Sequence, residues 1–281
     1  MNRTLSPPKN PASLVVAATL DAPRNRPYKQ VEHLASSTGR AAEIAAPADA
    51  RCAFLGSKEF QNMGVEAEQA LAASLITRTF APHDLIYLQD DDADYLYFIR
   101  SGYVRLSYLM EDGSAVLCGI LPPGESFGEL GIFEGGTHCD MATAIGEVVV
   151  AAVPLHQYRQ LRERHPQISA AIAHVVAKRY RAYVELTRML SLKTLAARIA
   201  QALLRLADGL GTHTLIDQRS YPYVGAMVTQ TDLGLMARGA RSNVNRALKT
   251  WERDKWISMQ DRSIIILNRP KLEALALQED F

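Results

Sequence analysis

The feature that most constrains the fold is a change of pattern at Pro166. Between Asp84 and Pro154 the sequence alternates apolar runs with glycine, proline and aspartate, whereas no glycine or proline occurs between Pro166 and Gly209. Apolar runs separated by turn residues favour strands, and a stretch of this length without a helix breaker favours helix. The chain is therefore expected to join a β-rich part to a helical part, in the α+β class.

The β-rich part, residues 57–165, is expected to form a double-sheet jelly roll. Residues 104–108 alternate apolar with polar side chains, as in a strand with one buried face. A hairpin signal, Asp112-Gly113, leads into a second apolar run. Because glycines recur evenly, at Gly102 and Gly146 among other places, short strands separated by turns are expected.

Two segments precede the predicted strands. Residues 1–56 are rich in proline, alanine and serine and lack periodicity, so they are expected to form a flexible extension. Residues 57–82 are expected to be helical, because Leu71, Leu75 and Ile76 recur at helical spacing ahead of a proline.

A long helix is expected over residues 166–192. Its apolar side chains recur at roughly heptad spacing, which is typical of a helix that pairs with another helix. This predicted seam consists of Ile172, Val176, Tyr183, Leu186 and Leu190. It indicates a homodimer joined along the helix, packing of the helix on its own jelly roll, or both. Thr194 is suited to cap a further helix over residues 195–207.

The C-terminal part, residues 193–281, is expected to contain a winged helix-turn-helix. Thr229 and Asp232 have the spacing of a capping box, which marks the start of a short helix. Gly239 permits a tight turn into a second helix that begins near Arg241. Two helices joined by a short glycine-containing turn are typical of DNA-binding helix-turn-helix units.

The second of these helices has two unlike faces. An apolar face carries Val244, Ala247, Leu248 and Trp251. The polar face carries no carboxylate, whereas a solvated helix face normally mixes charge signs. Arginine can recognise guanine, asparagine can pair with adenine and lysine can bind phosphate, so this face favours contact with double-stranded DNA. The predicted DNA contacts are Thr229, Gln230, Arg241, Ser242, Asn243, Asn245, Arg246, Lys249 and Arg262.

Both the predicted wing and the distribution of charge indicate that the C-terminal part of the chain binds DNA. Residues 256–259 and 264–267 flank a polar turn and predict a β-hairpin with Arg262 near its tip. Residues 58–165 hold 7 basic and 16 acidic side chains, a formal charge of −9. Residues 166–281 hold 17 basic and 10 acidic side chains, a formal charge of +7, which attracts a phosphate backbone.

Other classes of function lack support in the sequence. Three cysteines without a CxxC pair and seven dispersed histidines suit neither a disulfide framework nor a metal site, so no metal and no cofactor are expected. A cupin-like jelly-roll enzyme, the alternative from another class, needs clustered metal-binding histidines. No apolar run approaches the roughly 20 residues of a membrane span and no secretory signal is evident, so a cytoplasmic protein is expected.

Taken together, residues 57–277 resemble the Crp/Fnr family of bacterial regulators. The matching segments occur in the family's order, at residues 80–86, 96–106, 121–130, 198–204 and 228–251. The resemblance implies a homodimer with a cyclic-nucleotide-binding-like β-roll, and two recognition helices roughly 34 Å apart on a near-palindromic site. It also implies RNA polymerase as a protein partner. A cyclic-nucleotide-binding adaptor without DNA function is a further alternative, against which the carboxylate-free helix face argues.

Carried over from the family, the base-reading positions fall on Arg241, Ser242 and Arg246. Members that respond to cyclic AMP usually have glutamate at the middle position, which accepts from cytosine N4, so a different half-site is expected here. Ala240 stands where the family often has a serine N-cap, and losing such a cap typically costs about 1 kcal/mol.

The resemblance also implies an effector pocket, and this sequence departs from the family there. The pocket positions are Gly128, Glu129, Cys139, Asp140 and Tyr183. Glu129 keeps an acceptor for a ribose hydroxyl, but Cys139 and Asp140 replace the Arg-Ser pair that holds the cyclic phosphate. A carboxylate repels phosphate, and a strong bidentate contact is lost. Tyr183 and Val184 replace the Thr-Ser pair that contacts adenine, so binding of cyclic AMP in the usual mode is not expected.

Four alternatives for sensing stay open. The domain could bind a different small effector, sense redox state through Cys118 or Cys139, bind a cyclic dinucleotide outside the usual pocket, or act without any ligand. A lone cysteine on a strand is most often a small buried hydrophobe, which weakens the redox alternative.

Overall fold

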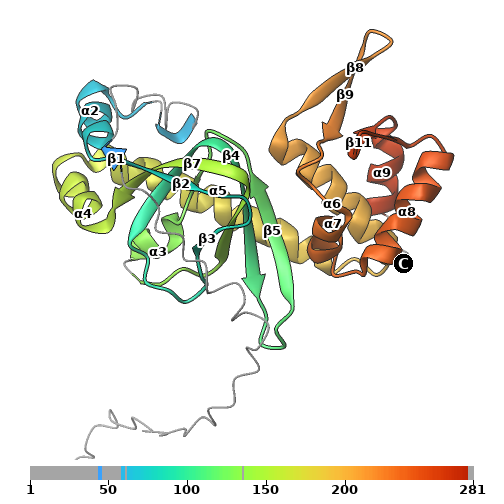
Figure 1. The fold of residues 1–281 in the computed structure, drawn as a ribbon, viewed down its shortest axis with the longest axis horizontal. Coiled ribbons are helices and arrows are strands. Elements are labelled where there is room, and N and C mark those ends of the chain that lie inside the picture. Colours follow the sequence, from blue (N-terminus) through green and yellow to red (C-terminus); the bar gives the residue numbers. More distant parts are fainter. Residues whose placement is uncertain (1–43, 46–57, 61, 135, 278–281) are drawn as a thin grey trace, which may run out of the picture.

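The computed structural model describes residues 44–45, 58–60, 62–134 and 136–277, and apart from residues 44–45 the predicted extension lies outside them. A β-rich lobe and a C-terminal lobe both lie along one long helix, α5 (Pro166–Leu190), which confirms the α+β class (Figure 1). Among the described helices, none combines the length and apolar character that a membrane span requires.

The β-rich lobe is built on two long antiparallel strands, β4 (Tyr95–Leu109) and β7 (Met141–Pro154), which pair along most of their length. The shorter strands are β1 (Ile44–Ala45), β2 (Ile76–Phe80), β3 (Leu85–Tyr87), β5 (Ala115–Leu121) and β6 (Ser126–Phe127). The first half of β4 pairs with β6 and the second half with β5, while β7 pairs first with β3 and then with β2. Because the two halves of β4 and of β7 pair with different strands, the sheet forms two layers, as the predicted roll requires.

Glycine explains how strands of this length bend. Gly102 has a φ of 81°, and the register between β4 and β7 shifts on both sides of Ser101. A Cβ at Gly102 would lie 2.2 Å from the carbonyl oxygen of Glu147, so only glycine fits there. The prediction that Gly102 and Gly146 separate short strands was wrong. Both lie inside long strands, because an antiparallel pair absorbs an extra residue as a bulge without ending.

The segment before the roll differs from the prediction as well. A short 3-10 turn, η2 (Lys58–Phe60), precedes helix α2 (Val65–Ala73). The helix predicted over residues 57–82 was wrong in its second half, because β2 begins at Ile76 and pairs with β7. Three of the five residues of β2 are β-branched, which favours a strand, and the pairing partner lies about 70 residues away in the sequence.

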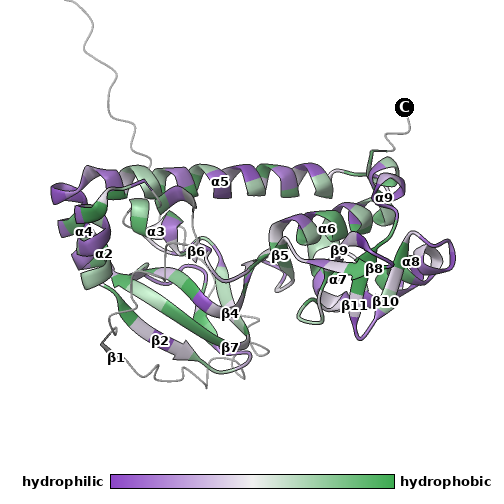
Figure 2. Cartoon of the chain, turned by 90° about the horizontal axis from the view of Figure 1, so that it is seen from above, coloured by the Kyte–Doolittle hydropathy of each residue, from purple (hydrophilic) through white to green (hydrophobic). Residues whose placement is uncertain are grey.

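Helices α2, α3 (Glu129–Glu134), α4 (Leu155–Arg164) and α5 pack against the roll. Helix α5 packs on the roll through Ile168, Ile172 and Val175, which are buried in one cluster with Leu96 and Phe98. Figure 2 shows α5 running straight along one side of the molecule, past the end of the roll.

The C-terminal lobe begins after a short break in the helical path. Its elements are α6 (Leu195–Leu210), β8 (His213–Ile216), β9 (Arg219–Val224), α7 (Gln230–Ala237), α8 (Arg241–Arg253), β10 (Ile257–Gln260), β11 (Ser263–Ile266) and α9 (Arg269–Ala276). The hydroxyl of Thr194 accepts from the backbone N–H of Ala197, which confirms the predicted cap of α6. The strands form one sheet in the order β10-β11-β9-β8.

The predicted wing is confirmed as the β10–β11 hairpin. Asp261 and Arg262 join its strands with φ values of 47° and 62°, as a type I′ turn requires. A second hairpin, β8–β9, turns at Asp217 and Gln218 with similar values and was not predicted. Its strands lack regular apolar alternation, and β8 is an edge strand with Leu215 exposed, so the sequence carried little signal for it.

Candidate DNA-binding face and effector pocket

The N-terminus of α7 is fixed by the predicted capping box, which the structure confirms. The hydroxyl of Thr229 accepts from the backbone N–H of Asp232 at 3.1 Å, and the Thr229 backbone N–H donates to the Asp232 carboxylate at 2.8 Å. The Thr229 hydroxyl also donates to that carboxylate at 2.7 Å. Two backbone N–H groups at the helix start are thereby satisfied inside the protein.

The turn between α7 and α8 is made differently from the prediction. The left-handed residue is Arg238, with a φ of 51°, and not Gly239. A Cβ at Gly239 would lie 2.5 Å from Cδ1 of Leu195 in α6, so the Leu195 side chain would have to move. Gly234 in α7 is more tightly confined, because its Cβ would lie 2.5 Å from the backbone carbonyl oxygen of Gly239. The glycines therefore allow the helices to pack closely, which local turn rules do not reveal.

Helix α8 presents its polar face to solvent. Val244, Leu248 and Trp251 are buried beneath it, and Ala247 is half-buried. The predicted contacts Arg241, Ser242, Arg246 and Lys249 are exposed, whereas Asn243 and Asn245 are half-buried. Within the described chain none of the three basic side chains forms a salt bridge. Ala240 is the N-cap and provides no side-chain hydrogen bond, as expected.

The remaining predicted DNA contacts lie on either side of α8. Arg262 is exposed at the tip of the wing. Gln230 is half-buried at the start of α7, and its Oε1 is buried without a hydrogen-bond partner in the described structure. Thr229 is exposed, although its hydroxyl is engaged in the capping box.

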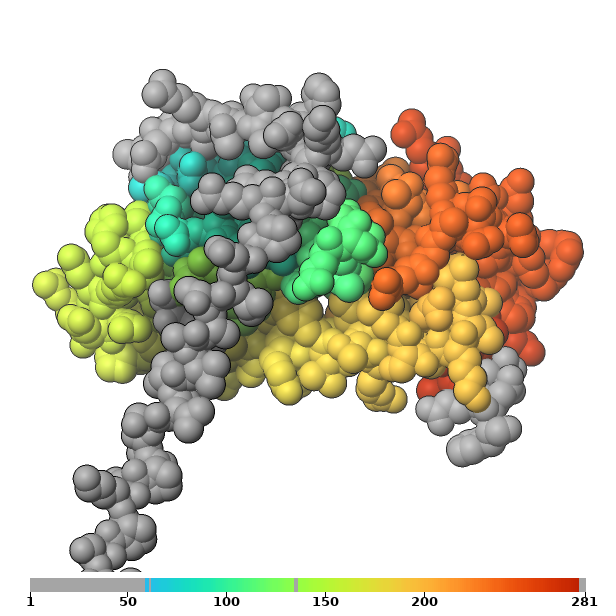
Figure 3. Space-filling model, turned by 90° about the horizontal axis from the view of Figure 1, so that it is seen from below, coloured from blue at the N-terminus to red at the C-terminus, as the bar shows by residue number. Residues whose placement is uncertain are grey.

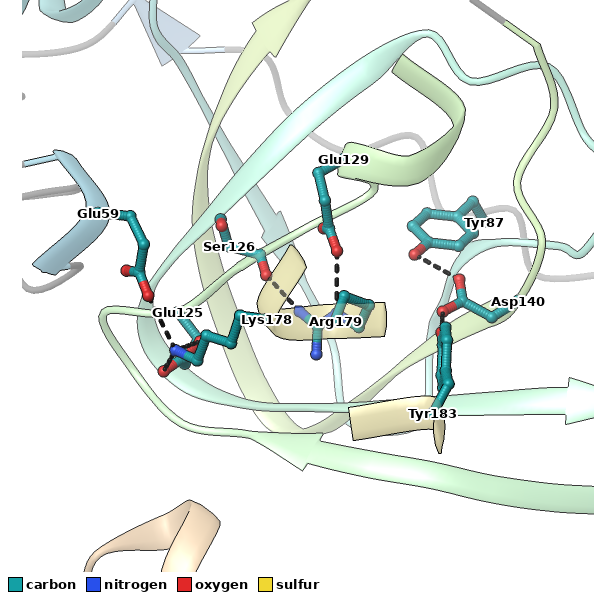
Figure 4. A network of polar contacts seen from close by, with 9 residues as sticks. All are labelled: Glu59, Tyr87, Glu125, Ser126, Glu129, Asp140, Lys178, Arg179 and Tyr183. Carbon is teal, nitrogen blue, oxygen red and sulfur yellow. Dashed lines mark hydrogen bonds and ion pairs between the residues drawn. The ribbon is translucent and has the colours of Figure 1, made fainter. Parts of the chain in front are cut away.

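Side chains around the predicted effector pocket bind one another (Figure 4). Asp140 accepts from the hydroxyl of Tyr87 at 2.9 Å and from that of Tyr183 on α5 at 2.7 Å. Glu129 accepts from Nε of Arg179, also on α5, at 2.9 Å. These contacts tie the roll to the long helix at two points.

Little room is left in this pocket. The cavity beside Gly128, Glu129, His138 and Asp140 measures about 10 Å³, whereas small-molecule sites typically measure about 300–1,000 Å³. His138 stacks on the ring of Tyr87 at 3.6 Å, and burial lowers its pKa. Burial, followed by the charge of Asp140, raises the pKa of Tyr183 and of Tyr87, so both phenols stay protonated as donors.

The two cysteines near the pocket are poor thiolates. Burial, and next the charge of Asp140, raises the pKa of Cys118 to about 12 and that of Cys139 to about 11. Cys118 is buried, while Cys139 is partly covered and keeps part of its surface exposed to solvent. Reactive cysteines have lowered pKa values, so this environment disfavours the redox alternative.

The predicted seam of α5 faces the protein's own interior. Ile172 and Leu186 are buried, Val176 and Leu190 are half-buried, and Tyr183 binds Asp140. Packing of this seam on its own roll was one of the alternatives that the sequence left open. A different stripe on α5 is exposed, with spacings of three, four, three and four residues. The exposed stripe consists of Ala170, Ala173, Ala177, Tyr180 and Val184.

The two lobes meet at the β4–β5 hairpin, which lies against α7. Nε of Arg105 on β4 donates to Oδ1 of Asp232 at 2.8 Å, and the Asp232 side chain is only 3% exposed. Figure 3 shows the green hairpin beside the orange surface of the C-terminal lobe. One carboxylate thus serves both the capping box of α7 and a salt bridge to the β-rich lobe.

Comparisons with known proteins match both lobes. A model of the cyclic nucleotide-binding domain matches residues 77–165, and one of the Crp-like helix-turn-helix domain matches residues 197–275. The chain is 29% identical over 213 residues to the CRP-like cAMP-activated global transcriptional regulator of Mycobacterium tuberculosis, covering 76% of this chain and 93% of that protein.

Solved structures agree with these matches. A CRP-family transcriptional regulator from Thermus thermophilus superposes with a TM-score of 0.57 at 27% identity, covering 70% of this chain and 95% of that one. FixK2 from Bradyrhizobium japonicum shares the fold with a TM-score of 0.62 at 23% identity, covering 72% and 96%. The mycobacterial protein and the Thermus protein are both named as transcriptional regulators. Because the two models match in order on the two lobes that α5 joins, the chain belongs to the Crp/Fnr family of DNA-binding transcription regulators.

Proposed function

We propose that the protein binds a near-palindromic operator as a homodimer, with one copy of α8 in each of two successive major grooves. The observation that carries this proposal is the exposed polar face of α8. Arg241, Arg246 and Lys249 project from it without acidic neighbours on that face, above the buried Val244 and Trp251. The proposed role of Arg262 and Thr229 is phosphate contact on either side of the groove.

The exposed stripe of α5 supports the dimer. Alternating spacings of three and four residues keep side chains on the seam between two paired helices. Ala170, Ala173 and Ala177 permit close approach, while Tyr180 and Val184 expose 67% and 42% of their surface, which is unusual for apolar side chains without a partner. Pairing of two copies along this stripe would bury both.

We further propose that cyclic AMP does not control DNA binding. Asp140 occupies the position from which the family's serine contacts phosphate, and it is held by Tyr87 and Tyr183 in a pocket of about 10 Å³. The contact between Tyr183 and Asp140 would replace the ligand as the bridge between roll and helix. As a regulator of chromosomal genes the protein would act in the cytoplasm and have RNA polymerase as its protein partner.

The alternative, control by cyclic AMP, is favoured by the name of the mycobacterial relative. One experiment separates the two. Genomic fragments bound by the purified protein are recovered and sequenced, and the affinity for the recovered site is measured with and without cyclic AMP. The proposal predicts a palindromic site and the same affinity in both conditions. An increase of tenfold or more with cyclic AMP would support the alternative.

The Arg241→Ala variant tests the recognition helix on the same site. We expect a loss of about 1–3 kcal/mol in binding free energy, with relaxed preference at one base position. Arg159→Ala, an exposed arginine on α4, is the matched control and should leave affinity unchanged. If Arg241→Ala binds the site as tightly as the wild type, α8 is not the recognition helix.

A further inference from the structure

A cleft of about 670 Å³ lies between the two lobes, apart from the predicted effector pocket. One wall is β5 of the β-rich lobe, the floor is α5, and the other wall is α6 and α9 of the C-terminal lobe. Its volume falls within the range of small-molecule sites. Because both lobes contribute to it, a bound molecule would contact both at once.

Arg205 on α6 makes only long contacts with its neighbours in this cleft. Its side chain is only 14% exposed, and its Nη1 is buried without a hydrogen-bond partner among the described residues. The Oε2 of Glu185 lies 3.5 Å from that nitrogen, and Nη2 donates to the carbonyl of Cys118 over 3.5 Å. A guanidinium removed from water normally forms several short hydrogen bonds to acceptors. Arg205 can therefore still donate to a further acceptor.

The other charged groups of the cleft are already paired closely. Lys178 donates to Glu125 at 2.8 Å, and Arg269 donates to Asp208 and to Glu273, each at 2.6 Å. These carboxylates are neutralised by short contacts, and they do not compete for Arg205. Glu185 is 68% exposed and is free to turn into solvent when a better acceptor arrives.

The rest of the lining includes apolar side chains and leaves space. Ile120, Leu121 and Pro122 line one side, with Leu204 and Met236 on the other. Two glycines also line the cleft, Gly119 on β5 and Gly209 on α6, and a Cβ on either would meet nothing within 4 Å. The cleft therefore combines one under-satisfied cation with an open space that has both apolar and polar walls.

We propose that this cleft binds a small organic anion, whose carboxylate or phosphate pairs with the guanidinium of Arg205 while its apolar body lies between β5 and α6. Arginine suits such groups because its planar fork matches two acceptor oxygens. The ligand would fix the C-terminal lobe against the roll. That regulatory consequence rests on the proposed DNA-binding function, whereas the binding itself does not.

The test uses the full chain without DNA and 8-anilinonaphthalene-1-sulfonate as probe, since this dye joins an anionic group to an apolar body. We expect saturable fluorescence that Arg205→Gln weakens about tenfold or more, as loss of a charge-assisted contact should. Gly119→Phe, which fills the cleft from the opposite wall without touching the charge, should abolish binding. Arg159→Gln is the control and should bind as the wild type. Thermal melting of each variant verifies that it is folded.

Displacement of the dye by other compounds tests whether the cleft requires an anionic group. Sodium octanoate should displace the dye from the wild type, whereas the neutral octan-1-ol should not. Equal displacement by both, or unchanged dye binding in folded Arg205→Gln and Gly119→Phe, would overturn the proposal. If Arg205→Gln does not fold, the proposal is tested by the Gly119→Phe variant and by the two displacers alone. Operator affinity with and without octanoate is measured separately. A failure of the DNA-binding proposal can then be told apart from a failure of the anion-binding proposal.

Discussion

At the scale of single residues, the predicted effector pocket is shaped by how Asp140 is bound. Its side chain is buried, and its two oxygens accept from Tyr87 and Tyr183, which come from different parts of the chain. A buried carboxylate needs such donors, since an unmet charge in a protein interior is costly. The cavity beside this carboxylate measures only about 10 Å³.

Tyr183→Phe removes one of these donors and leaves the ring in place. Because a buried carboxylate loses a hydrogen bond, we expect the free energy of unfolding to fall by about 1–3 kcal/mol. Urea denaturation measures this change. Tyr108→Phe, on an exposed ring of β4, is the control and should shift stability by less than about 0.5 kcal/mol. Equal effects of the two substitutions would contradict the described network.

Cys139 permits a second prediction at this scale. A pKa of about 11 in place of the ordinary 9.0 lowers its thiolate fraction at pH 8 by about a hundredfold. Its alkylation by iodoacetamide should therefore be far slower in the folded protein than in urea. The Cys139 thiol ionises at a lower pH in the unfolded chain than in the folded protein. Its ionisation therefore favours the unfolded state, and the free energy of unfolding should decline only as the pH rises through 9. Rapid alkylation of the folded protein at pH 8 would restore the redox alternative.

At the scale of elements, α7 is attached to β4 by the salt bridge between Arg105 and Asp232. The same carboxylate closes the capping box through Thr229, so the start of α7 and the β-rich lobe share one anchor. Asp112, at the tip of the β4–β5 hairpin, has a lowered pKa, chiefly because Ser114 donates to it, with a smaller effect from the charge of Arg238.

A double-mutant cycle measures this anchor. Arg105→Ala, Asp232→Asn and the double variant should give a coupling energy of about 1–3 kcal/mol in unfolding, because Asp232 is buried. The exposed pair of Arg253 and Asp254 is the matched control, with an expected coupling of about 0–1 kcal/mol. The inferred anchor would be absent if both cycles gave the same small value.

At the scale of the whole molecule, the proposed dimer determines whether two recognition helices reach one operator. Ala177 lies at the centre of the exposed stripe on α5, where two helices would approach most closely. Ala177→Arg should therefore yield monomers at micromolar concentration in analytical ultracentrifugation. Affinity for the palindrome should fall by about 10²-fold or more, because the second half-site is no longer bound by the same complex. Gln160→Arg, exposed on α4, adds the same charge elsewhere and should remain dimeric.

Much of the fold could be predicted where the signal is local. The capping box at Thr229, the cap at Thr194, the wing turn before Ser263 and the buried face of α8 follow from short-range spacing. Predictions that depended on distant partners did less well. Ile76 was assigned to a helix because its pairing with β7 is not visible in nearby residues.

The amino-acid sequence by itself determined the order of the parts, the two-faced character of α8 and the side-chain types at Cys139 and Asp140, because each is a property of residue type and spacing. The tertiary structure decided which side of α5 is buried, how Asp140 is satisfied, and that Arg205 faces a cleft between the lobes. Those outcomes depend on which surfaces meet when distant segments pack, and burial of a charge has its cost only once its surroundings exist.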